Sequence, residues 1–286
     1  MKTKQLTHDS DWRYFLRKQF IRIFNHLAIK TIPKKILVSL IAGALGLSAS
    51  FGQPNRQRVI NENLYLISID DSVFIHVSHH QVESYGMVSS NGLIVIKNGQ
   101  AIMVDTPMDN EKTEKLTTYL QDSMHVKVSG LIIGHFHEDC LGGLGYLQEK
   151  GVKSIAHELT VQKCNELNLP IPTVSFTDSL VLQFNGEKIV CRYFGVGHAA
   201  DNITVWLPRQ RILFGGCLIK SVNSKNLGNL SDAVMEKWDE TVEKILQTYP
   251  DLTTVIPGHG NAGGIELLKH TIELVKEKKA EDILAE

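Results

Sequence analysis

The residues best suited to carry chemistry in this 286-residue chain form the motif His135-x-His137-x-Asp139. Two histidines and a carboxylate at alternate positions can place two nitrogen donors and one oxygen donor around a small pocket, and Zn²⁺ favours such donors. Three more residues of ligand type follow, each next to a glycine: His198, Cys217 and His259. The six residues divide into two sets of three. Three protein ligands leave one coordination position open for water, as in catalytic zinc sites.

Each candidate also has a simpler interpretation. Asp139 would serve as the N-cap of a following helix, His198 alone would be an ordinary residue at a strand end, and Cys217 alone would be a small buried residue. The metal-ligand interpretation is stronger for the candidates together than for each alone. Each follows a predicted strand, and neighbouring glycines let the backbone come close to a bound metal. Strand ends at one edge of a sandwich converge, so one pocket can collect all six. Five other histidines lack this setting and are interpreted as non-ligands: His79, His80, His125, His157 and His270.

The elements that must position these residues begin with strands in the first half of the chain. Strand patterns predict residues 64–69, 73–77, 92–97, 101–105 and 128–133, the last running directly into the first motif. Residues 79–90 lack a regular period, and we predict a mobile hairpin loop there. Apolar residues at helical spacing predict helices over residues 109–121, 141–149 and 157–167.

The second half repeats this pattern of strands followed by helices. Strands are predicted at residues 180–184, 188–194, 203–207, 212–214 and 253–256. One helix is predicted over residues 232–248 with Ser231 as its N-cap, and a closing helix over residues 264–278. Two sheets packed face to face with helices outside satisfy this order. We therefore predict an α/β protein, a four-layer αββα sandwich formed as one domain by residues 51–286.

Composition places the chain among ordinary globular proteins, with 43% hydrophobic and 21% charged residues. The formal net charge of −1 conceals an asymmetry, because residues 1–50 hold 9 of the 30 Lys and Arg but only 2 of the 31 Asp and Glu. The remainder has 21 basic and 29 acidic residues, a net charge of −8. An acidic body argues against nucleic acid as a partner.

The basic N-terminal part is predicted to be a leader, residues 1–50, that contains a signal peptide. Lys34-Lys35 precede an apolar run at residues 36–47, and Ser48-Ala49-Ser50 offers small residues for cleavage. A membrane anchor is the alternative, but this run is shorter than the roughly 20 residues needed to span a bilayer. We therefore predict export to the periplasm and no stable membrane association after cleavage.

The four cysteines are predicted to form no structural disulfide, although an exported chain permits one. Cys140 and Cys217 fall in the candidate metal motifs, where a metal-bound cysteine must be a free thiolate. Cys164 and Cys191 are interpreted as small buried residues in a helix and a strand.

Taken together, these motifs resemble those of class B metallo-β-lactamases, in the di-zinc, broad-spectrum, carbapenemase-like subclass. The resemblance covers about residues 60–280 and is carried by His-x-His-x-Asp, Gly-His-x-x-Asp-Asn, Gly-Gly-Cys-x-x-Lys, Gly-Asn and Pro-Gly-His-Gly. The first motif alone marks only a wider hydrolase superfamily, whereas the combination is specific. The resemblance implies two Zn²⁺ ions per chain, the first bound by His135, His137 and His198, and the second by Asp139, Cys217 and His259.

The same resemblance implies roles for residues around the zinc ligands. Lys220 would bind the substrate carboxylate, Asn229 would help to polarise the β-lactam carbonyl, and Tyr85 would contact the substrate from the hairpin loop. Asp105 and Cys140 would support the ligands from behind, although many relatives have Arg or Ser at position 140. Cys140 lies next to Asp139 and could itself touch the metal, but Cys217 is the better-placed sulfur. Simpler interpretations of Lys220 as a surface lysine and of Asn229 as a turn residue remain open.

The implied activity is zinc-dependent hydrolysis of the β-lactam amide bond in penicillins, cephalosporins and carbapenems, which confers antibiotic resistance. Asp139 would orient the attacking water, and the protein would act as a monomer on a small-molecule substrate. One alternative is another hydrolase of the same fold, such as a thioesterase of the glyoxalase II kind, but such relatives lack a sulfur ligand. The second is an exported zinc-binding protein without turnover, which would normally close its coordination sphere.

Overall fold

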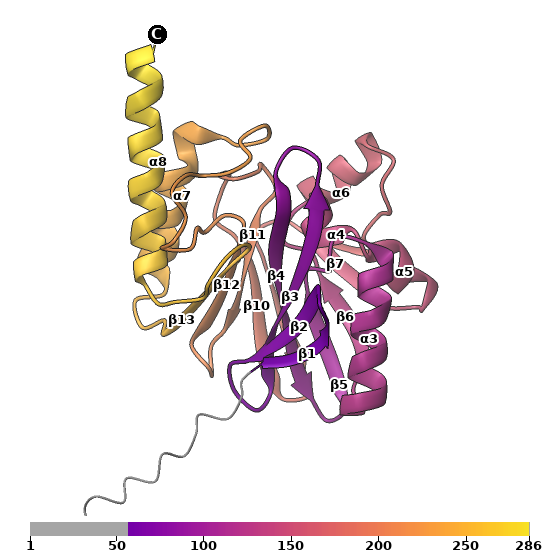
Figure 1. The fold of residues 1–286 in the computed structure, drawn as a ribbon. Helices are drawn as coiled ribbons and strands as arrows, with labels where there is room; N and C mark the ends of the chain where they lie inside the picture. The colour runs from indigo at the N-terminus through magenta and orange to yellow at the C-terminus, as the bar shows by residue number, and fades with distance from the viewer. Residues whose placement is uncertain (1–56, 286) are drawn as a thin grey trace, which may run out of the picture. The chain divides into compact units, whose positions relative to one another are not determined.

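The computed structural model describes residues 57–285, and the predicted leader lies outside them. Two β-sheets stand face to face between two groups of helices (Figure 1). The first sheet has eight strands in the order β1 to β8: Gln57–Asn61, Leu64–Ser68, Val73–Val82, Gly86–Lys97, Gln100–Val104, Lys127–Ile132, Lys153–His157 and Val174–Phe176. Its strands pair antiparallel as far as β5, and β5 to β8 pair in parallel.

The second sheet has five strands in the order β13-β12-β11-β10-β9. Their bounds, from β9 to β13, are Ser179–Phe184, Glu187–Tyr193, Ile203–Leu207, Ile212–Gly216 and Thr254–Pro257. Strands β9 to β12 pair antiparallel with their neighbours. Strand β13 follows a helical crossover and pairs with β12 in parallel. Residues that follow β12 and β13 therefore emerge at the same edge, because parallel neighbours end on the same side.

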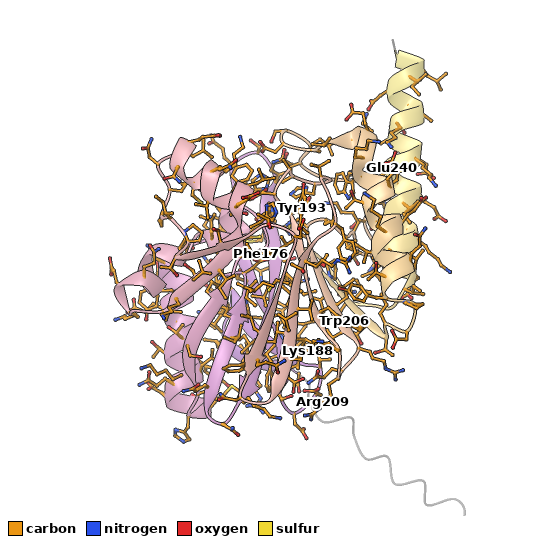
Figure 2. All side chains as sticks on the ribbon, turned by 180° about the vertical axis from the view of Figure 1, so that it is seen from behind. Phe176, Lys188, Tyr193, Trp206, Arg209 and Glu240 are labelled. Carbon is orange, nitrogen blue, oxygen red and sulfur yellow. The ribbon has the colours of Figure 1, made fainter. Side chains whose placement is uncertain are left out.

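Helices cover the outer face of each sheet, because each sheet carries apolar residues on that face as well as on the face that meets the other sheet. The helices are α3 Asn110–Met124, α4 Glu138–Leu141, α5 Leu144–Glu149, α6 Glu158–Glu166, α7 Met235–Thr248 and α8 Glu266–Ala285. One apolar cluster lies between the first sheet and α3, α5 and α6, a second between the sheets, and a third between the second sheet and α7 and α8. Trp206 of β11 (Figure 2) belongs to the third cluster, where its ring stacks on Tyr249 with centroids 4.6 Å apart. The predicted αββα sandwich is confirmed.

The prediction of a mobile loop at residues 79–90 is wrong for most of that range. Strand β3 continues to Val82 and β4 begins at Gly86, so only residues 83–85 form the turn. The outer part of this hairpin extends past the ends of its neighbours (Figure 1), and residues 79–89 are half-buried or exposed. A strand without one fully buried side has no apolar alternation, which is why the sequence pattern did not show it.

The predicted helix over residues 141–149 is two short helices, α4 and α5, separated by Gly142 and Gly143. A Cβ atom at Gly142 would overlap the backbone of Met108, and one at Gly143 would overlap Thr113. The glycines therefore bring the chain against the start of α3. Asp139 lies inside α4, whose N-cap is His137, so its interpretation as a helix cap is also wrong.

Three further features differ from the predictions. Strands β1, β7 and β8 were not predicted, and they are short strands at or near the edges of the first sheet. Helix α7 begins at Met235 with Val234 as its N-cap, so Ser231 is not the cap. Helix α8 runs seven residues past the predicted end, Lys278, to Ala285. Within residues 57–285, the structure contains no helix with the length and apolar character needed to span a bilayer.

Candidate metal centre

The first motif follows β6, and a strained aspartate fixes its start. Asp105 directly follows β5, is buried, and adopts a left-handed backbone with φ 58°. Non-glycine residues pay a conformational cost there, and such residues cluster at functional sites. The Asp105 carboxylate accepts the backbone N–H of Gly134 at 2.6 Å, immediately before His135. The predicted supporting position of Asp105 therefore has a physical basis, since it holds the loop that carries the histidines.

The first three predicted nitrogen donors lie together. Donor atoms of His135, His137 and His198 are all within 4.8 Å of one another. Nε2 of His135 lies 2.9 Å from Nδ1 of His137, and the His198 ring centroid lies 5.0 Å from that of His135. Asn202 fixes the His198 loop, because its amide accepts the backbone N–H of Ala199 at 3.0 Å and donates to Gly195 O at 2.9 Å.

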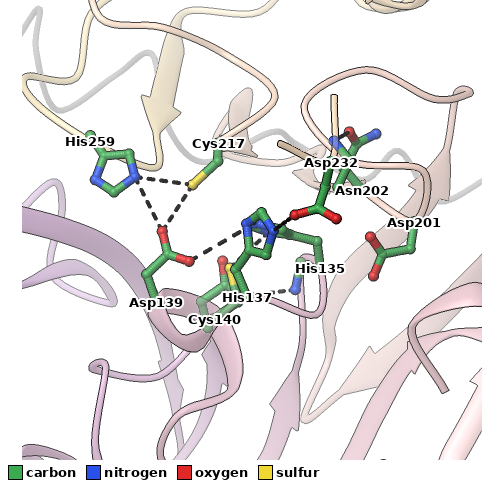
Figure 3. A network of polar contacts seen from close by, with 12 residues as sticks. His135, His137, Asp139, Cys140, Asp201, Asn202, Cys217, Asp232 and His259 are labelled. Carbon is green, nitrogen blue, oxygen red and sulfur yellow. Dashed lines mark hydrogen bonds and ion pairs between the residues drawn. The ribbon is translucent and has the colours of Figure 1, made fainter. Parts of the chain in front are cut away.

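The second set is also assembled. Donor atoms of Asp139, Cys217 and His259 lie within 4.8 Å of one another. Oδ2 of Asp139 lies 3.2 Å from Cys217 Sγ and 3.2 Å from His259 Nε2, while its other oxygen lies 3.9 Å from His135 Nε2 (Figure 3). Asp139 thus stands between the two sets. Gly258 permits this approach, since a Cβ there would overlap Cys217.

The sulfur of Cys217 is prepared to act as a ligand. A hydrogen bond from Cys140 lowers the pKa of Cys217 to about 6, against the opposing effect of burial. Cys217 is therefore largely a thiolate at neutral pH, the form that binds metals. Burial raises the pKa of Cys140 well above its usual range, so Cys140 keeps its proton. The four cysteines are all free and buried, and no disulfide joins them.

The nitrogens that face away from the site are held by other groups of the protein. Nδ1 of His135 lies 3.0 Å from Cys140 Sγ, and Nε2 of His137 lies 3.0 Å from Asp232 Oδ2. The Nδ1–H of His259 donates to Ser89 O at 2.7 Å. Each ring therefore directs its remaining nitrogen inward. Outer-shell partners orient metal-binding histidines in this way.

Burial and chemistry both fit a metal at these donors. Burial lowers the pKa of His135 to about 3 and lowers that of His198 well below its usual range, so both rings are neutral at pH 7. Neutral imidazole is the form that coordinates metals. Nδ1 of His198 is buried and has no hydrogen-bond partner in the described part of the chain. Two sets of nitrogen, oxygen and sulfur donors match the preference of Zn²⁺.

Asp232 is a functional candidate that the sequence analysis missed. Its carboxylate reaches His137 across 95 positions in the sequence (Figure 3), and Ser231 donates to the same oxygen at 3.0 Å. Both residues had been assigned to the start of a helix. The only signal was general, namely that metal-binding histidines often pair with a carboxylate. Nothing in the local pattern selects which aspartate that is.

Asn91 is a second missed residue, and it secures the loop that carries His259. Its side chain donates to Pro257 O at 2.9 Å and to Gly260 O at 2.7 Å, and its backbone N–H donates to Gly258 O at 2.8 Å. Strand β4 of the first sheet thereby holds a loop that follows β13 of the second. The two halves of the sandwich are joined at the metal donors.

A pocket of about 460 Å³ opens over the donors. His137, Asp139, His198 and His259 contribute to its lining. The predicted substrate-binding residues Tyr85, Lys220 and Asn229 line it as well, together with Val82, Val88 and Met108. The structure therefore places all three predicted residues at one cavity with the metal donors.

Lys220 and Asn229 have different surroundings in this pocket. Lys220 is only 7% exposed, which excludes its interpretation as a solvated surface lysine. Its ammonium lies 5.2 Å from the centre of the Trp238 ring. Asn229 is exposed, and its side-chain oxygen accepts the N–H of Ser231 at 3.1 Å. The turn interpretation of Asn229 is thus correct, yet its amide N–H groups remain able to face a substrate.

An αββα sandwich with two adjoining three-donor sets at one sheet edge and an open pocket above them defines the class of metal-dependent hydrolases. The comparisons with known proteins narrow this class. Residues 85–259 match the model of the metallo-beta-lactamase superfamily. A metallo-beta-lactamase type 2 of Bacteroides fragilis is 45% identical over 218 residues, covering 76% of this chain and 88% of the relative. One from Bacillus sp. (strain 170) is 35% identical over 232 residues, covering 80% and 90%.

Solved structures agree with these sequence relatives. A metallo-beta-lactamase from Pontibacter korlensis is 36% identical with a TM-score of 0.72, and the match covers 74% of this chain and 99% of that one. The chain belongs to the metallo-beta-lactamase superfamily, which confirms the family predicted from its motifs, and it is a zinc-dependent hydrolase.

Proposed function

We propose that this chain is a zinc-dependent β-lactamase that hydrolyses the β-lactam amide bond and so confers resistance to these antibiotics. The observation that carries the proposal is the location of the buried cation Lys220 in the same 460 Å³ pocket as both donor sets. Penicillins, cephalosporins and carbapenems share a strained cyclic amide next to a carboxylate. A metal centre for the amide and a cation for the carboxylate are the two features that such substrates require.

Two Zn²⁺ ions per chain are proposed, with His135, His137 and His198 holding one, and Asp139, Cys217 and His259 the other. When bound, zinc supplies a Lewis acid and makes water nucleophilic at neutral pH. Asp105 and Cys140 contribute from behind, the first by holding Gly134 and the second by contacting His135 and Cys217.

The protein residues each have a distinct task in this reaction. In the metal-free protein, burial tends to raise the pKa of Asp139, but the hydrogen bond from His259 and the neighbouring charges outweigh it and hold the pKa well below its usual range. A carboxylate is also the form that would hold a metal, and Asp139 would accept a hydrogen bond from the attacking water and orient it. Water adds to the carbonyl carbon, the C–N bond breaks, and the released nitrogen takes a proton. Asn229 donates to the carbonyl oxygen, where negative charge develops.

Substrate binding is assigned to Lys220 and to the apolar side of the pocket, which Tyr85 lines together with Val82, Val88 and Met108. The Lys220 ammonium pairs with the substrate carboxylate, which positions the amide rather than changing its chemistry. Burial lowers the pKa of Lys220, whereas the nearby Cys217 and Asp139 act to raise it. Tyr85 at the hairpin tip is 59% exposed and covers the substrate from the opposite side.

The decisive experiment measures hydrolysis of a penicillin, a cephalosporin and a carbapenem together with the zinc content of the purified protein. We expect turnover of all three with two zinc ions per chain, loss on chelation, and recovery when Zn²⁺ is returned. The variant Cys217→Ser should lower the zinc content towards one ion. A zinc-loaded protein that leaves all three β-lactams intact would contradict the proposal.

The same experiment separates the alternatives. A thioesterase of the same fold would cleave a glutathione thioester and spare the β-lactams, whereas a zinc-sequestering protein would cleave neither. The open pocket and the thiolate of Cys217 favour the β-lactamase over both. We also propose export to the periplasm through the signal peptide in residues 1–50, and action as a monomer. Cell fractionation and light scattering of the mature protein test these two proposals.

A further inference from the structure

One wall of the pocket is formed by the outer part of the β3–β4 hairpin. Val82, Tyr85 and Val88 line the cavity from this hairpin, whereas the opposite lining comes from residues around Lys220 and Asn229. The hairpin tip lies beyond the sandwich core (Figure 1). A two-stranded hairpin without a core of its own is marginally stable in water. Its position over the donors must therefore be fixed by contacts at its base.

Strand β4 has such contacts, and they lead to the metal donors. Ser89 O accepts the Nδ1–H of His259 at 2.7 Å, and Asn91 holds the loop around Gly258. A change on this side of the hairpin would disturb a zinc ligand as well as the wall. The contacts of β4 therefore cannot adjust substrate binding independently of the metal.

Strand β3 is held by a different cluster, which contains no predicted zinc ligand. Nδ1 of His80 lies 3.2 Å from Lys112 Nζ and 3.3 Å from Asp109 Oδ2. Lys112 Nζ also donates to Asp109 Oδ2 at 2.5 Å. His80 is two residues before Val82 and pairs across the hairpin with Val88, so the cluster holds the segment that carries two wall residues.

The other end of this cluster is a rigid support. Asp109 is the N-cap of α3 and accepts the backbone N–H of Lys112 at 2.7 Å. Leu116 and Leu120 of the same helix pack into the apolar cluster against the first sheet, which fixes the helix in place. The side chains of Lys112, Asp109 and His80 are 20%, 31% and 32% exposed, so they are partly shielded from solvent. Shielded pairs contribute more than exposed surface pairs, which are often worth little.

We propose that His80, Asp109 and Lys112 are positioning residues that hold the hairpin wall at its distance from the metal donors and thereby set the KM for β-lactams. The cluster acts on substrate binding alone, because it reaches Val82 and Val88 without touching a metal donor. This inference rests on the proposed β-lactamase function. It assigns substrate affinity to three residues outside the pocket lining, on the N-terminal turn of α3 and on β3.

The main test is Lys112→Met, which removes the ammonium and keeps most of the aliphatic stem. A second variant, Asp109→Ser, keeps a good N-cap for α3 while removing the carboxylate that meets His80. The matched control is Lys115→Met, because Lys115 lies on the same helix and, within residues 57–285, its one ion pair is with the exposed Glu111 at 2.5 Å. Each protein is measured for amide hydrogen exchange across residues 80–90, for kcat and KM with a cephalosporin, and for zinc content.

Each test variant removes one contact between His80 and the start of α3, together with the Lys112–Asp109 pair. This loss predicts a rise in KM of about three- to tenfold, with kcat within about twofold of the parent. Exchange of the hairpin amides should accelerate about tenfold in the absence of substrate. Zinc content should stay at the parental value, and Lys115→Met should match the parent in all three measurements. A structural role alone would lower stability without separating KM from kcat.

Three results would overturn the inference. The first is that Lys112→Met and Asp109→Ser behave like Lys115→Met in exchange and KM. The second is faster exchange with unchanged KM, which would show that the tether exists but does not set affinity. The third is a fall in zinc content, which would place the effect at the metal. A parent protein that hydrolyses no β-lactam would refute the proposed function, while the exchange measurement would still decide whether the cluster holds the hairpin.

Discussion

At the scale of single residues, the site depends on groups whose ionisation is set by their surroundings. Cys217 is held as a thiolate by Cys140, and Asp139 is held as a carboxylate by His259. Lys220 is a buried cation, so it is not a lysine that solvent keeps charged at the protein surface. Cys217, Asp139 and His259 were selected from the sequence by their types and motifs, and Lys220 by the family resemblance. Their mutual distances were not available from the sequence.

The first prediction at this scale concerns Lys220. Replacing Lys220 with Met removes the cation and keeps a chain of similar length beside Trp238. Hydrogen bonds between charged groups are worth about 1.5–3 kcal/mol, so KM should rise roughly 10- to 100-fold while kcat changes less. Steady-state kinetics with a cephalosporin checks this. Lys276→Met, which removes an exposed cation on α8, should leave KM unchanged; equal effects of the two substitutions would exclude a binding role for Lys220.

The second prediction concerns Asp232, which orients His137. The variant Asp232→Asn keeps the shape but loses the charge, and loss of such a partner typically weakens metal binding by about 10- to 100-fold. Competition with a chromophoric chelator measures the affinity for zinc. In the cobalt-loaded protein, the thiolate-to-cobalt absorption band reports metal bound by Asp139, Cys217 and His259. This band should persist in Asp232→Asn. Asp251→Asn, an exposed change after α7, is the matched control. Parental zinc affinity in Asp232→Asn would reject the positioning role.

At the scale of elements, local sequence patterns predicted the strands and helices that are regular and half-buried. The strand around Leu64 and the helix α3 followed from alternation and from helical spacing. Strand β8, with three residues, was too short to show a period. The outer hairpin has no fully buried side, so its pairing follows from strand register and not from burial. Element boundaries at α4, α5 and α7 were decided by tertiary contacts.

A prediction at the element scale involves His76 on β3, which is 1% exposed. Burial lowers its pKa from 6.5 to about 4. The unfolded chain therefore binds this proton first, so stability present above pH 6.5 is lost as the pH falls towards 4. The loss approaches roughly 3 kcal/mol. His76→Gln, which can still donate to Asp105 O, should lack this part of the pH dependence.

Urea unfolding of the zinc-free proteins between pH 7 and pH 4 measures this effect without interference from metal release. His125→Asn is the control, since His125 is exposed at the end of α3 and its left-handed backbone suits asparagine. Parallel stability curves for the parent and His76→Gln would refute the prediction. Gly92 gives independent support for the tight fit, because a Cβ there would overlap the His76 ring.

At the scale of the whole molecule, the donors come from both halves of the sandwich. His135, His137 and Asp139 follow β6 of the first sheet. His198 lies between β10 and β11, and Cys217 and His259 follow β12 and β13, all in the second sheet. A metal held by the proposed donors would therefore join the two sheets. Binding that occurs only in the folded state stabilises it, by about 4 kcal/mol at a thousandfold excess over the dissociation constant.

We therefore expect chelation to lower the melting temperature by roughly 10 °C for a protein of this size. Calorimetry with EDTA and then with excess Zn²⁺ measures the change. Restoration by Zn²⁺ and not by Mg²⁺ would show that the donor chemistry is responsible. An unchanged melting temperature in EDTA would mean that the metal does not link the halves.

By itself, the sequence determined the donor types, the class of the fold and the family, because motifs and periodicity are written in short stretches of chain. Only the tertiary structure decided that Asp139 stands between the two donor sets, that Lys220 is buried, and that Asp232 orients His137. These facts depend on contacts between segments that are far apart in the chain. No local pattern specifies which distant partner a side chain meets, since that is fixed by how the two sheets pack and where their strands end.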